Sequence, residues 1–222
     1  MKDVIITGST GVIGTVLTTA IPHRVTCFDL PKSDARDYQQ LLSSMRGHDV
    51  AIHLAWNTTI DNDHTELLAP ENILMTFNVY RAAVEAGVQR VVMASSVHAD
   101  KFVDRKLSGL LLPYSLPLPD SPYGAGKCMM ESLGRHYADS KNLEVVCVRF
   151  GGVNVNNLPP QEPKSERQVW LSHSDCVRLI NCCIEASEIP NNYSAFYGVS
   201  HNRDRLHDYS NPVGWQPLDG AD

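Results

Sequence analysis

The glycine-spaced turn near the N-terminus constrains the fold of this chain more than any other feature. The run Asp3–Thr7 is apolar and β-branched, as in a buried strand, and glycines spaced G-x-x-G-x-x-G follow it directly. Gly8 would let the chain leave the strand, Gly11 would let the backbone approach a pyrophosphate, and Gly14 would let the next helix pack closely on the sheet. A strand, a dinucleotide-binding loop and a helix are therefore predicted, with a glycine-rich turn that binds nothing as the alternative. The expected cofactor contacts in this loop are Gly8, Gly11, Val12, Ile13 and Gly14.

An aspartate at the end of the second strand-like run supports this interpretation. Arg24–Phe28 leads into Asp29, about 20 residues beyond the glycines, where a carboxylate can hydrogen-bond the adenosine ribose. A carboxylate at this place repels a 2′-phosphate, and no arginine follows it directly, although Lys32 is near. The sequence therefore favours NAD over NADP as the cofactor. An ordinary loop aspartate is the alternative interpretation.

Strand-like and helix-like segments alternate along the 222 residues, which is typical of a parallel sheet covered by helices on both faces. We therefore predict an α/β fold, a Rossmann-type doubly wound parallel sheet that forms a single NAD-binding domain over residues 1–222 with a small C-terminal substrate-binding portion. Substrate-binding elements are expected in the segments 56–70, 97–122 and 151–222, and the proline-rich part 107–122 is expected to form a lid. The expected strands span 3–7, 24–28, 50–55, 90–94, 144–149 and 194–199, and the expected helices span 37–45, 71–86, 122–139 and 173–186.

The composition argues against several classes of function. The 19 Lys and Arg residues and 25 Asp and Glu residues give a formal charge of −6 without a basic run, so nucleic acid is not an expected partner. The apolar stretches are too short to cross a membrane, and Met1 leads directly into a strand without a signal-peptide pattern. We therefore expect a cytoplasmic protein with no membrane partner. The six cysteines and nine histidines lack the spacings of metal sites, so no metal is expected.

A tyrosine and a lysine four residues apart predict the chemistry. On a helix, Tyr123 and Lys127 would share one face, one turn apart. A free phenol has a pKa of about 10, and a neighbouring ammonium favours the phenolate, so Lys127 would make Tyr123 a usable base while also reaching the nicotinamide ribose. Ser96, at the end of a strand, would hydrogen-bond the reacting oxygen of the substrate. These three residues predict proton transfer from a substrate alcohol as its carbon gives hydride to the cofactor, whereas the Tyr-Lys spacing alone also occurs on solvated helix faces.

With these motifs the chain resembles the extended short-chain dehydrogenase/reductase family, which includes sugar-nucleotide epimerases and dehydratases, over nearly its whole length. The resemblance implies an enzyme in which Leu54 and Ala55 line the adenosine and pyrophosphate region, Asn72 lies under the cofactor and Asp34 contacts adenine. It also implies that the catalytic pair contacts the cofactor, and that two copies form a homodimer through the two longest helices. The residues that carry it are 7–14, Asp29, 49–55, Asn72, Ser95, Ser96, 123–127 and 214–217.

Within that family the chain is most similar to the NAD-dependent uronate and related sugar dehydrogenases, which oxidise the anomeric carbon of an unactivated sugar to a lactone. The run 96–98, Ser-Val-His, is similar to their Ser-Asn-His, and the run 170–172 follows an arginine and precedes a short C-terminal part. Val97 replaces an amide-bearing residue, so the preferred sugar is expected to differ. The resemblance implies a small sugar or sugar-acid substrate, with a site lined by Thr58, His98 and Arg167, of which the arginine could bind a carboxylate or phosphate in bidentate fashion.

Three functions therefore compete. The first is net oxidation of a hydroxyl of a small sugar or sugar acid, at the anomeric carbon as the resemblance implies, with hydride to NAD and the proton to Tyr123. The second is an epimerase or dehydratase acting on a sugar nucleotide with a retained cofactor, which the short C-terminal part argues against. The third is a regulator that senses NAD(P) without chemistry, which would have no need of the Tyr-Lys pair.

Overall fold

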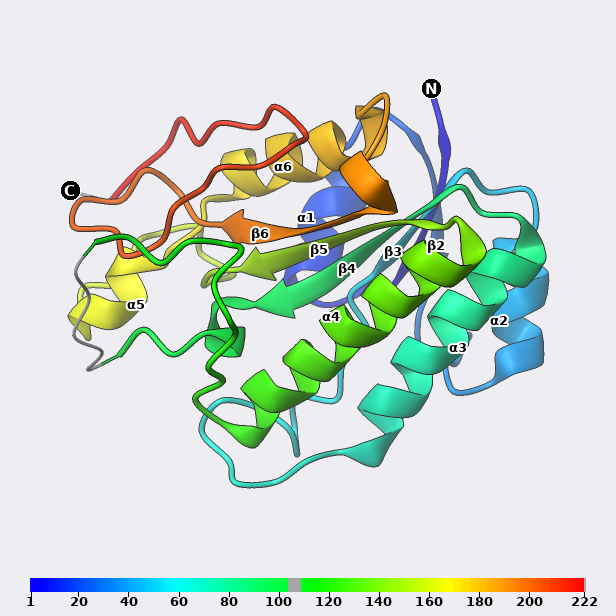
Figure 1. Ribbon diagram of the computed structural model, residues 1–222, viewed down its shortest axis with the longest axis horizontal. Helices are drawn as coiled ribbons and strands as arrows, with labels where there is room; N and C mark the ends of the chain where they lie inside the picture. The colour runs from blue at the N-terminus through cyan, green and yellow to red at the C-terminus, as the bar shows by residue number, and fades with distance from the viewer. Residues whose placement is uncertain (104–108, 222) are drawn as a thin grey trace.

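Six parallel strands form one sheet at the centre of the molecule, in the order β2-β1-β3-β4-β5-β6 (Figure 1). The computed structural model describes residues 1–103 and 109–221, so positions 107 and 108 of the expected lid lie outside the described residues. The strands are β1 (Asp3–Thr7), β2 (Arg24–Phe28), β3 (Val50–His53), β4 (Arg90–Ser96), β5 (Glu144–Phe150) and β6 (Tyr193–Gly198). The helices are α1 (Val12–Ala20), α2 (Tyr38–Met45), α3 (Pro70–Ala86), α4 (Pro122–Lys141), α5 (Lys164–Gln168) and α6 (His173–Glu185), with short 3-10 turns η1 (Val97–Ala99) and η2 (Pro190–Asn192).

Successive residues of the buried strands pack on opposite faces of the sheet, as the two-residue period of a strand requires. In β1, Ile5 joins the core formed with α2, α3 and α4, whereas Val4 and Ile6 join the core formed with α1 and α6. In β4, Val91 and Val92 divide in the same way. Figure 1 shows these two helix layers on either side of the sheet. Burial on both faces explains why the strands are continuous apolar runs, and the predicted Rossmann-type doubly wound α/β fold is confirmed.

Helix ends follow local capping rules and lie close to the expected boundaries. Asp37 caps α2 by accepting a hydrogen bond from the Gln40 backbone at 3.1 Å. Gly87 ends α3 with φ 78°, a left-handed conformation that glycine adopts without strain. Every expected strand and helix is present, with ends no more than two residues away from those expected. The structure differs in α5, which forms inside a stretch that we expected to be loop.

The strand order creates a crevice at the carboxyl end of β1. The chain leaves β1 toward β2 at one edge of the sheet, then returns through α2 to β3 on the other side of β1. Connections that diverge from one strand leave a gap between them at its carboxyl end, and ligands of open α/β sheets bind there. The glycine turn that follows β1 therefore lies at the expected ligand site.

A buried ion pair fixes α4, which carries Tyr123 and Lys127, to the sheet. Arg149 of β5 donates to both carboxylate oxygens of Glu131 on α4, at 2.9 and 2.8 Å, and to the Tyr197 hydroxyl at 3.1 Å. The Ser95 hydroxyl of β4 also donates to Glu131, at 2.5 Å. Breaking such a buried pair costs about 3–5 kcal/mol, because it leaves a charge without its partner. The orientation of the helix over β4 and β5 is therefore strongly determined.

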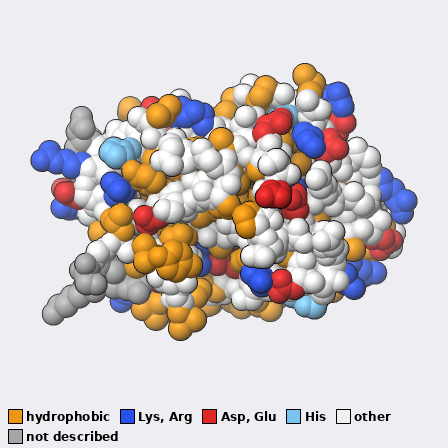
Figure 2. Space-filling model, turned by 45° about the horizontal axis from the view of Figure 1, so that its top comes forward, with side chains coloured by type: hydrophobic (Ala, Val, Ile, Leu, Met, Phe, Trp, Pro, Cys, Tyr) orange, Lys and Arg blue, Asp and Glu red, His pale blue; other side chains and the backbone are white. Residues whose placement is uncertain are grey.

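The surface carries charges of both signs. On the face shown in Figure 2, Lys and Arg side chains are interspersed with Asp and Glu rather than joined into a continuous basic surface, and hydrophobic side chains gather at the lower left. Within residues 1–103 and 109–221, no helix combines the length and the hydropathy that a membrane span requires.

Candidate active site

Two adjoining cavities open at the carboxyl edge of the sheet, with volumes of about 840 Å³ and 420 Å³. Gly8, Gly11, Leu54 and Trp56 line both of them. The larger cavity extends to the residues expected to be catalytic, and the smaller one extends to Asp29. Because both cavities are lined by Gly8 and Gly11, they form one cleft over the glycine turn.

The glycine turn is shaped by close backbone contacts. Gly8 has φ +72°, and a Cβ built on it would lie 2.5 Å from the backbone nitrogen of Ala55. A Cβ on Gly14 would lie 2.4 Å from the Gly8 carbonyl oxygen. A Cβ on Gly11 would meet its nearest atom at 3.4 Å, so packing within the chain does not by itself require this glycine. Gly11 is also the N-cap of α1 and has no side chain over the free amides there, which leaves them directed toward the cleft as a phosphate site needs.

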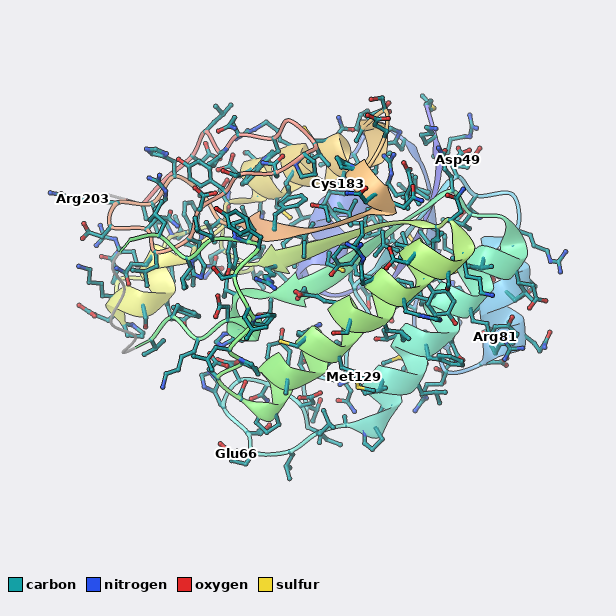
Figure 3. The ribbon with its side chains drawn as sticks, in the orientation of Figure 1. Asp49, Glu66, Arg81, Met129, Cys183 and Arg203 are labelled. Atoms are coloured by element: carbon teal, nitrogen blue, oxygen red, sulfur yellow. The ribbon has the colours of Figure 1, made fainter. Side chains whose placement is uncertain are left out.

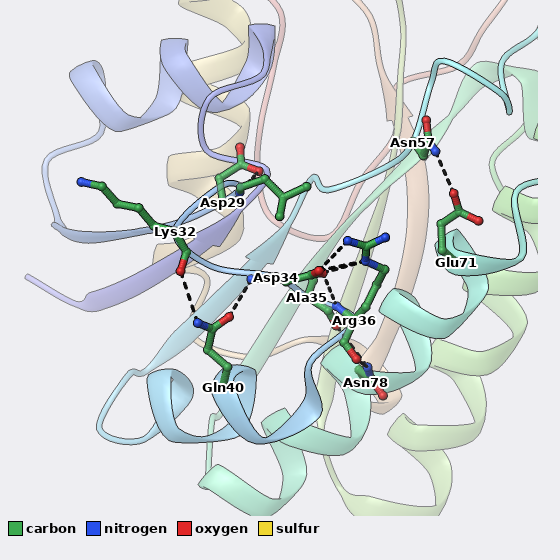
Figure 4. Close-up of polar contacts among 10 residues, drawn as sticks. Asp29, Lys32, Asp34, Ala35, Arg36, Gln40, Asn57, Glu71 and Asn78 are labelled. Atoms are coloured by element: carbon green, nitrogen blue, oxygen red, sulfur yellow. Dashed lines mark hydrogen bonds and ion pairs between the residues drawn. The ribbon is translucent and has the colours of Figure 1, made fainter.

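The smaller cavity contains the groups expected to bind adenosine, together with one that the sequence reasoning missed. Asp29 accepts hydrogen bonds from the Thr10 backbone at 2.8 Å and the Thr10 hydroxyl at 2.6 Å. Asp34 lines the same cavity and pairs with Arg36, whose Nη2 lies 2.6 Å from Oδ2 (Figure 4). The hydrogen bonds from Arg36 hold the pKa of Asp34 below its usual value. An arginine therefore lies near Asp29 in space although none follows it directly in the sequence.

Tyr123, Lys127 and Ser96 come together at the far end of the larger cavity. Ser121 caps α4 by accepting from the Gly124 backbone at 3.1 Å, which places Tyr123 in the first turn of the helix. A side-chain hydrogen bond joins Ser96 and Tyr123. Lys127 follows one turn later and donates from Nζ to the Ala94 carbonyl oxygen at 2.8 Å. The spatial grouping expected from the Tyr-Lys spacing and the strand end is present.

The protonation of this group differs from the expectation. Burial raises the pKa of Tyr123 to about 12, only partly offset by the hydrogen bond with Ser96, and the negative charges of Asp63 and Asp61 raise it further. Burial lowers the pKa of Lys127 to about 7, which the charges of Asp61 and Glu131 oppose. We expected the ammonium to make the phenol more acidic. In this structure desolvation of both groups is the larger effect.

Two of the three expected sugar contacts line the larger cavity, namely Thr58 and His98. The Nδ1 atom of His98 lies 2.8 Å from Asp120 and its Nε2 atom lies 3.6 Å from Asp63. Burial opposes a charge on this ring, but the hydrogen bond with Asp120 and the two carboxylates outweigh it and raise the pKa of His98. The ring also lies 5.8 Å from that of Tyr123 between centroids. His98 is thus a polar group beside the phenol, held by acidic neighbours.

Arg167 is not among the residues that line the larger cavity. It borders a separate pocket of about 360 Å³ with Lys164 and Arg203, at the end of the molecule that carries α5 (Figure 3). Glu166, its neighbour, lines the larger cavity instead. Successive residues of a helix point about 100° apart, so the unexpected helix α5 turns the acidic residue toward the cavity and the basic one away. The structure therefore gives the predicted role of Arg167 no geometric support.

Asn72 supports the loop that borders the cleft rather than lining either cavity. Its side-chain oxygen accepts from the Asn57 backbone at 2.7 Å, and its nitrogen donates to the buried Asp61 at 3.0 Å. Leu54 and Ala55, by contrast, line the cleft as expected.

The three expected substrate-binding elements contribute unequally. The described lining residues come from all three, but none lies beyond Val169, so the described residues after Val169 do not line the larger cavity. Sequence reasoning missed several lining residues because no periodicity marks them; an aromatic residue directly after the third strand was the one available signal. The missed residues are Trp56, Asp63, His64, Ala94, Ser95, Val97, Phe150, Gly151, Gly152, Val153, Pro163, Glu166 and Val169.

Fold and site together define a dinucleotide-binding protein with a Ser-Tyr-Lys group at one end of its cleft. The chain belongs to the NAD dependent epimerase/dehydratase family, whose model matches residues 4–171. It is 32% identical to the L-arabinose 1-dehydrogenase (NAD(P)(+)) of Haloferax volcanii, over 100% of this chain and 98% of that protein. It is 31% identical to the NAD-dependent glucose-6-phosphate dehydrogenase of the same organism, over 90% of this chain and 80% of the relative. Among solved structures, a mutant uronate dehydrogenase from Agrobacterium tumefaciens complexed with NAD superposes with a TM-score of 0.81 at 26% identity, covering 100% of this chain and 86% of the other.

Proposed function

We propose that this protein is an NAD-dependent dehydrogenase that oxidises the anomeric hydroxyl of a free, neutral aldose to a lactone. The observation that carries the proposal is the grouping of Ser96, Tyr123 and Lys127 at the end of a cleft that begins at the glycine turn. The likeness to sugar dehydrogenases over 98% of the length of one relative supports it.

The residues of the cleft fit NAD, because the cavities join over Gly8 and Gly11 and end at a carboxylate, Asp29. The free amides of α1 would hold the pyrophosphate and Asp29 would hold the adenosine ribose. When bound, NAD supplies the hydride acceptor.

The proton is moved by this chain's own side chains. The Ser96 hydroxyl would hydrogen-bond the substrate oxygen and hold it beside Tyr123, whose phenolate would take the hydroxyl proton while the C–H hydrogen would leave as hydride to bound NAD. Because burial raises the pKa of Tyr123, its phenol keeps its proton at neutral pH and must lose it before the oxygen can act as a base, so a positive charge on Lys127 is needed to favour the phenolate. The product is the lactone, and the proton then passes from Tyr123 to solvent.

The acidic lining of the larger cavity supports a neutral substrate. Asp63 and Glu166 border it, and among the described lining residues Lys127 is the single Lys or Arg. Two like charges about 4 Å apart repel by about 1 kcal/mol in water and about 4 kcal/mol near a protein surface. A uronate or a sugar phosphate would meet this repulsion, whereas an uncharged aldose would find hydrogen-bond acceptors.

A panel of substrates tests the proposal. Neutral aldoses, uronic acids and sugar phosphates are offered with NAD, and NADH is followed by its absorbance. We expect kcat/KM to be highest for a neutral aldose and to rise for uronates in Glu166→Gln. A preference of the unaltered protein for a uronate or sugar phosphate would contradict the neutral substrate. Turnover of a sugar nucleotide without net NADH would instead favour the epimerase.

We also propose a homodimer through α3 and α4. Leu74 and Phe77 of α3 are 47% and 42% exposed, and Met129 of α4 is 53% exposed (Figure 3), although the two helices pack side by side. Apolar side chains on neighbouring helices favour contact with the same face of a second copy. Light scattering should give twice the chain mass, and Phe77→Glu should give the monomer; a monomeric unaltered protein would refute the proposal.

A further inference from the structure

Lys127 lies almost wholly inside the protein, although its role requires a positive charge. It is 4% exposed. Within the described chain its Nζ donates one hydrogen bond, to the Ala94 carbonyl oxygen at 2.8 Å. An ammonium has three donors, and removing it from water without compensation strongly disfavours its charged form. Other groups must therefore stabilise the charge.

The indole of Trp56 is the first of these groups. Nζ of Lys127 lies 3.6 Å from the centroid of the Trp56 ring, well within the range of a cation–π interaction, for which tryptophan is the most favourable partner. The same ring meets Tyr123 edge-on, with centroids 6.0 Å apart and planes at 88°. Trp56 thus contacts both members of the Tyr-Lys pair.

The carboxylate of Asp61 is the second. Asp61 is fully buried in the loop between β3 and α3. Its Oδ2 atom accepts from Asn72 at 3.0 Å, while its Oδ1 atom has no hydrogen-bond partner among the described residues. A buried carboxylate oxygen in this state is costly unless a positive charge is near. Its negative charge raises the pKa of Lys127.

The other titratable groups that face Lys127 do not replace these two. His53 of β3 is neutral, because burial and the charge of Lys127 lower its pKa to about 3. Glu131, one turn further along α4, accepts hydrogen bonds from two of the Arg149 nitrogens, Nε and Nη2, in the buried ion pair. Tyr123 carries no charge until it loses its proton. Asp61 is therefore the negative charge best able to act on the ammonium.

We propose that Trp56 and Asp61 are positioning residues that keep Lys127 charged and hold it beside Tyr123. Both belong to the segment after β3, which also carries Thr58 and Asp63 of the substrate cavity. Correct folding of this loop therefore determines the charge on the lysine as well as the shape of the sugar site. The consequence for catalysis rests on the proposed dehydrogenase function, but the charge of Lys127 does not.

A titration of Lys127 tests the proposal without any activity assay. The protein is prepared with lysine labelled with ¹³C at Cε, and the Lys127 resonance is assigned by its loss in Lys127→Met. The chemical shift of this resonance is followed against pH by NMR, which gives the midpoint of the Lys127 titration. We expect Asp61→Asn to lower the midpoint by about one pH unit, Trp56→Leu to lower it by about half a unit, and Trp56→Phe to have a smaller effect. Trp215→Phe is the control, because the indole nitrogen of Trp215, like that of Trp56, has no hydrogen-bond partner among the described residues, but Trp215 lies in the core with α6. The midpoint of Lys127 should stay unchanged in this variant.

Unchanged midpoints in folded Trp56→Leu and Asp61→Asn would overturn the proposal. If Asp61→Asn does not fold, the midpoints of Trp56→Leu and Trp56→Phe are compared instead, and equal, unshifted midpoints in these two variants would overturn the proposal. Once a substrate is found, Trp56→Leu should narrow the pH profile of kcat/KM, since the ammonium of Lys127 would lose its proton at lower pH. If no sugar is oxidised but the midpoints shift as expected, the proposed function fails while this inference stands.

Discussion

The two ends of the cleft hold their charged groups in opposite ways. At the adenosine end, Asp34 and Arg36 are 30% and 49% exposed in their side chains and pair with each other two residues apart. At the reacting end, Lys127 is 4% exposed and is held by groups that are distant in the sequence. Exposed ion pairs contribute little to stability and can be replaced at little cost. The stability of a buried charge depends on each group that contacts it. We therefore expect substitutions at the adenosine end to have small effects and substitutions at the reacting end to have large ones.

The strongest test of this contrast removes the phenolic oxygen. Tyr123→Phe should lower kcat by about 10²–10⁴-fold, because general base catalysis is lost. NAD affinity, measured by calorimetry, should change little, since the binding end is untouched. An unchanged kcat would show that another group accepts the proton. The large effect expected at the reacting end would then be wrong.

Burial of Lys127 predicts how stability depends on pH. Its pKa is lowered from 10.5 to about 7 in the folded state, so the unfolded chain binds more protons between these values and this group makes stability rise with pH. The slope is at most about 1.4 kcal/mol per pH unit. Urea unfolding of the unaltered protein and of Lys127→Met should diverge between about pH 7 and pH 9. Parallel curves would mean that the lysine is effectively solvated.

A pair of glycine substitutions compares the centre of the cleft with an unconstrained turn. Gly8 and Gly47 both have positive φ, at +72° and +82°, but only a Cβ at Gly8 would meet backbone within 4 Å. Gly47→Ala should cost about 1 kcal/mol from backbone strain. Gly8→Ala should cost about 1–3 kcal/mol more, from overpacking against the backbone of Leu54 and Ala55, and should weaken NAD binding. The free energy of unfolding of both variants is measured by denaturation. Equal decreases in Gly8→Ala and Gly47→Ala would mean that the turn at Gly8 relaxes to admit a side chain.

The smallest expected effect concerns cofactor preference at the adenosine end of the cleft. Asp34→Asn should release Arg36, which lies in the same cavity as Asp29 and could then pair with a 2′-phosphate. We expect kcat/KM with NADP to rise relative to NAD by about tenfold or less, which corresponds to at most about 1.4 kcal/mol. Arg36→Gln in the Asp34→Asn background is the control and should abolish the gain. No change in the ratio would mean that Asp29 alone decides between the cofactors.

Predictions from the sequence agree with the structure where a feature depends only on residues that are close together in the chain. The predicted helices 37–45 and 71–86 agree with α2 and α3 to within one residue at each end, because the Asp37 cap and the turn at Gly87 depend on neighbours within a few positions. Arg167 was different, because a single helical turn, α5, decides which way it points. Residues of the loop after β3 carried no periodic signal, and their positions depend on hydrogen bonds with Asn72 of α3 and on the contact of Trp56 with Lys127 of α4.

The sequence by itself determined the order of strands and helices, the glycine turn and the pairing of Tyr123 with Lys127, because each follows from backbone conformation or the period of one element. Only the tertiary structure decided the protonation of that pair, the acidic lining by Asp63 and Glu166, and the contact of Trp56 with the lysine. Desolvation and charge act between groups that are close in space, and no spacing along the chain records those distances.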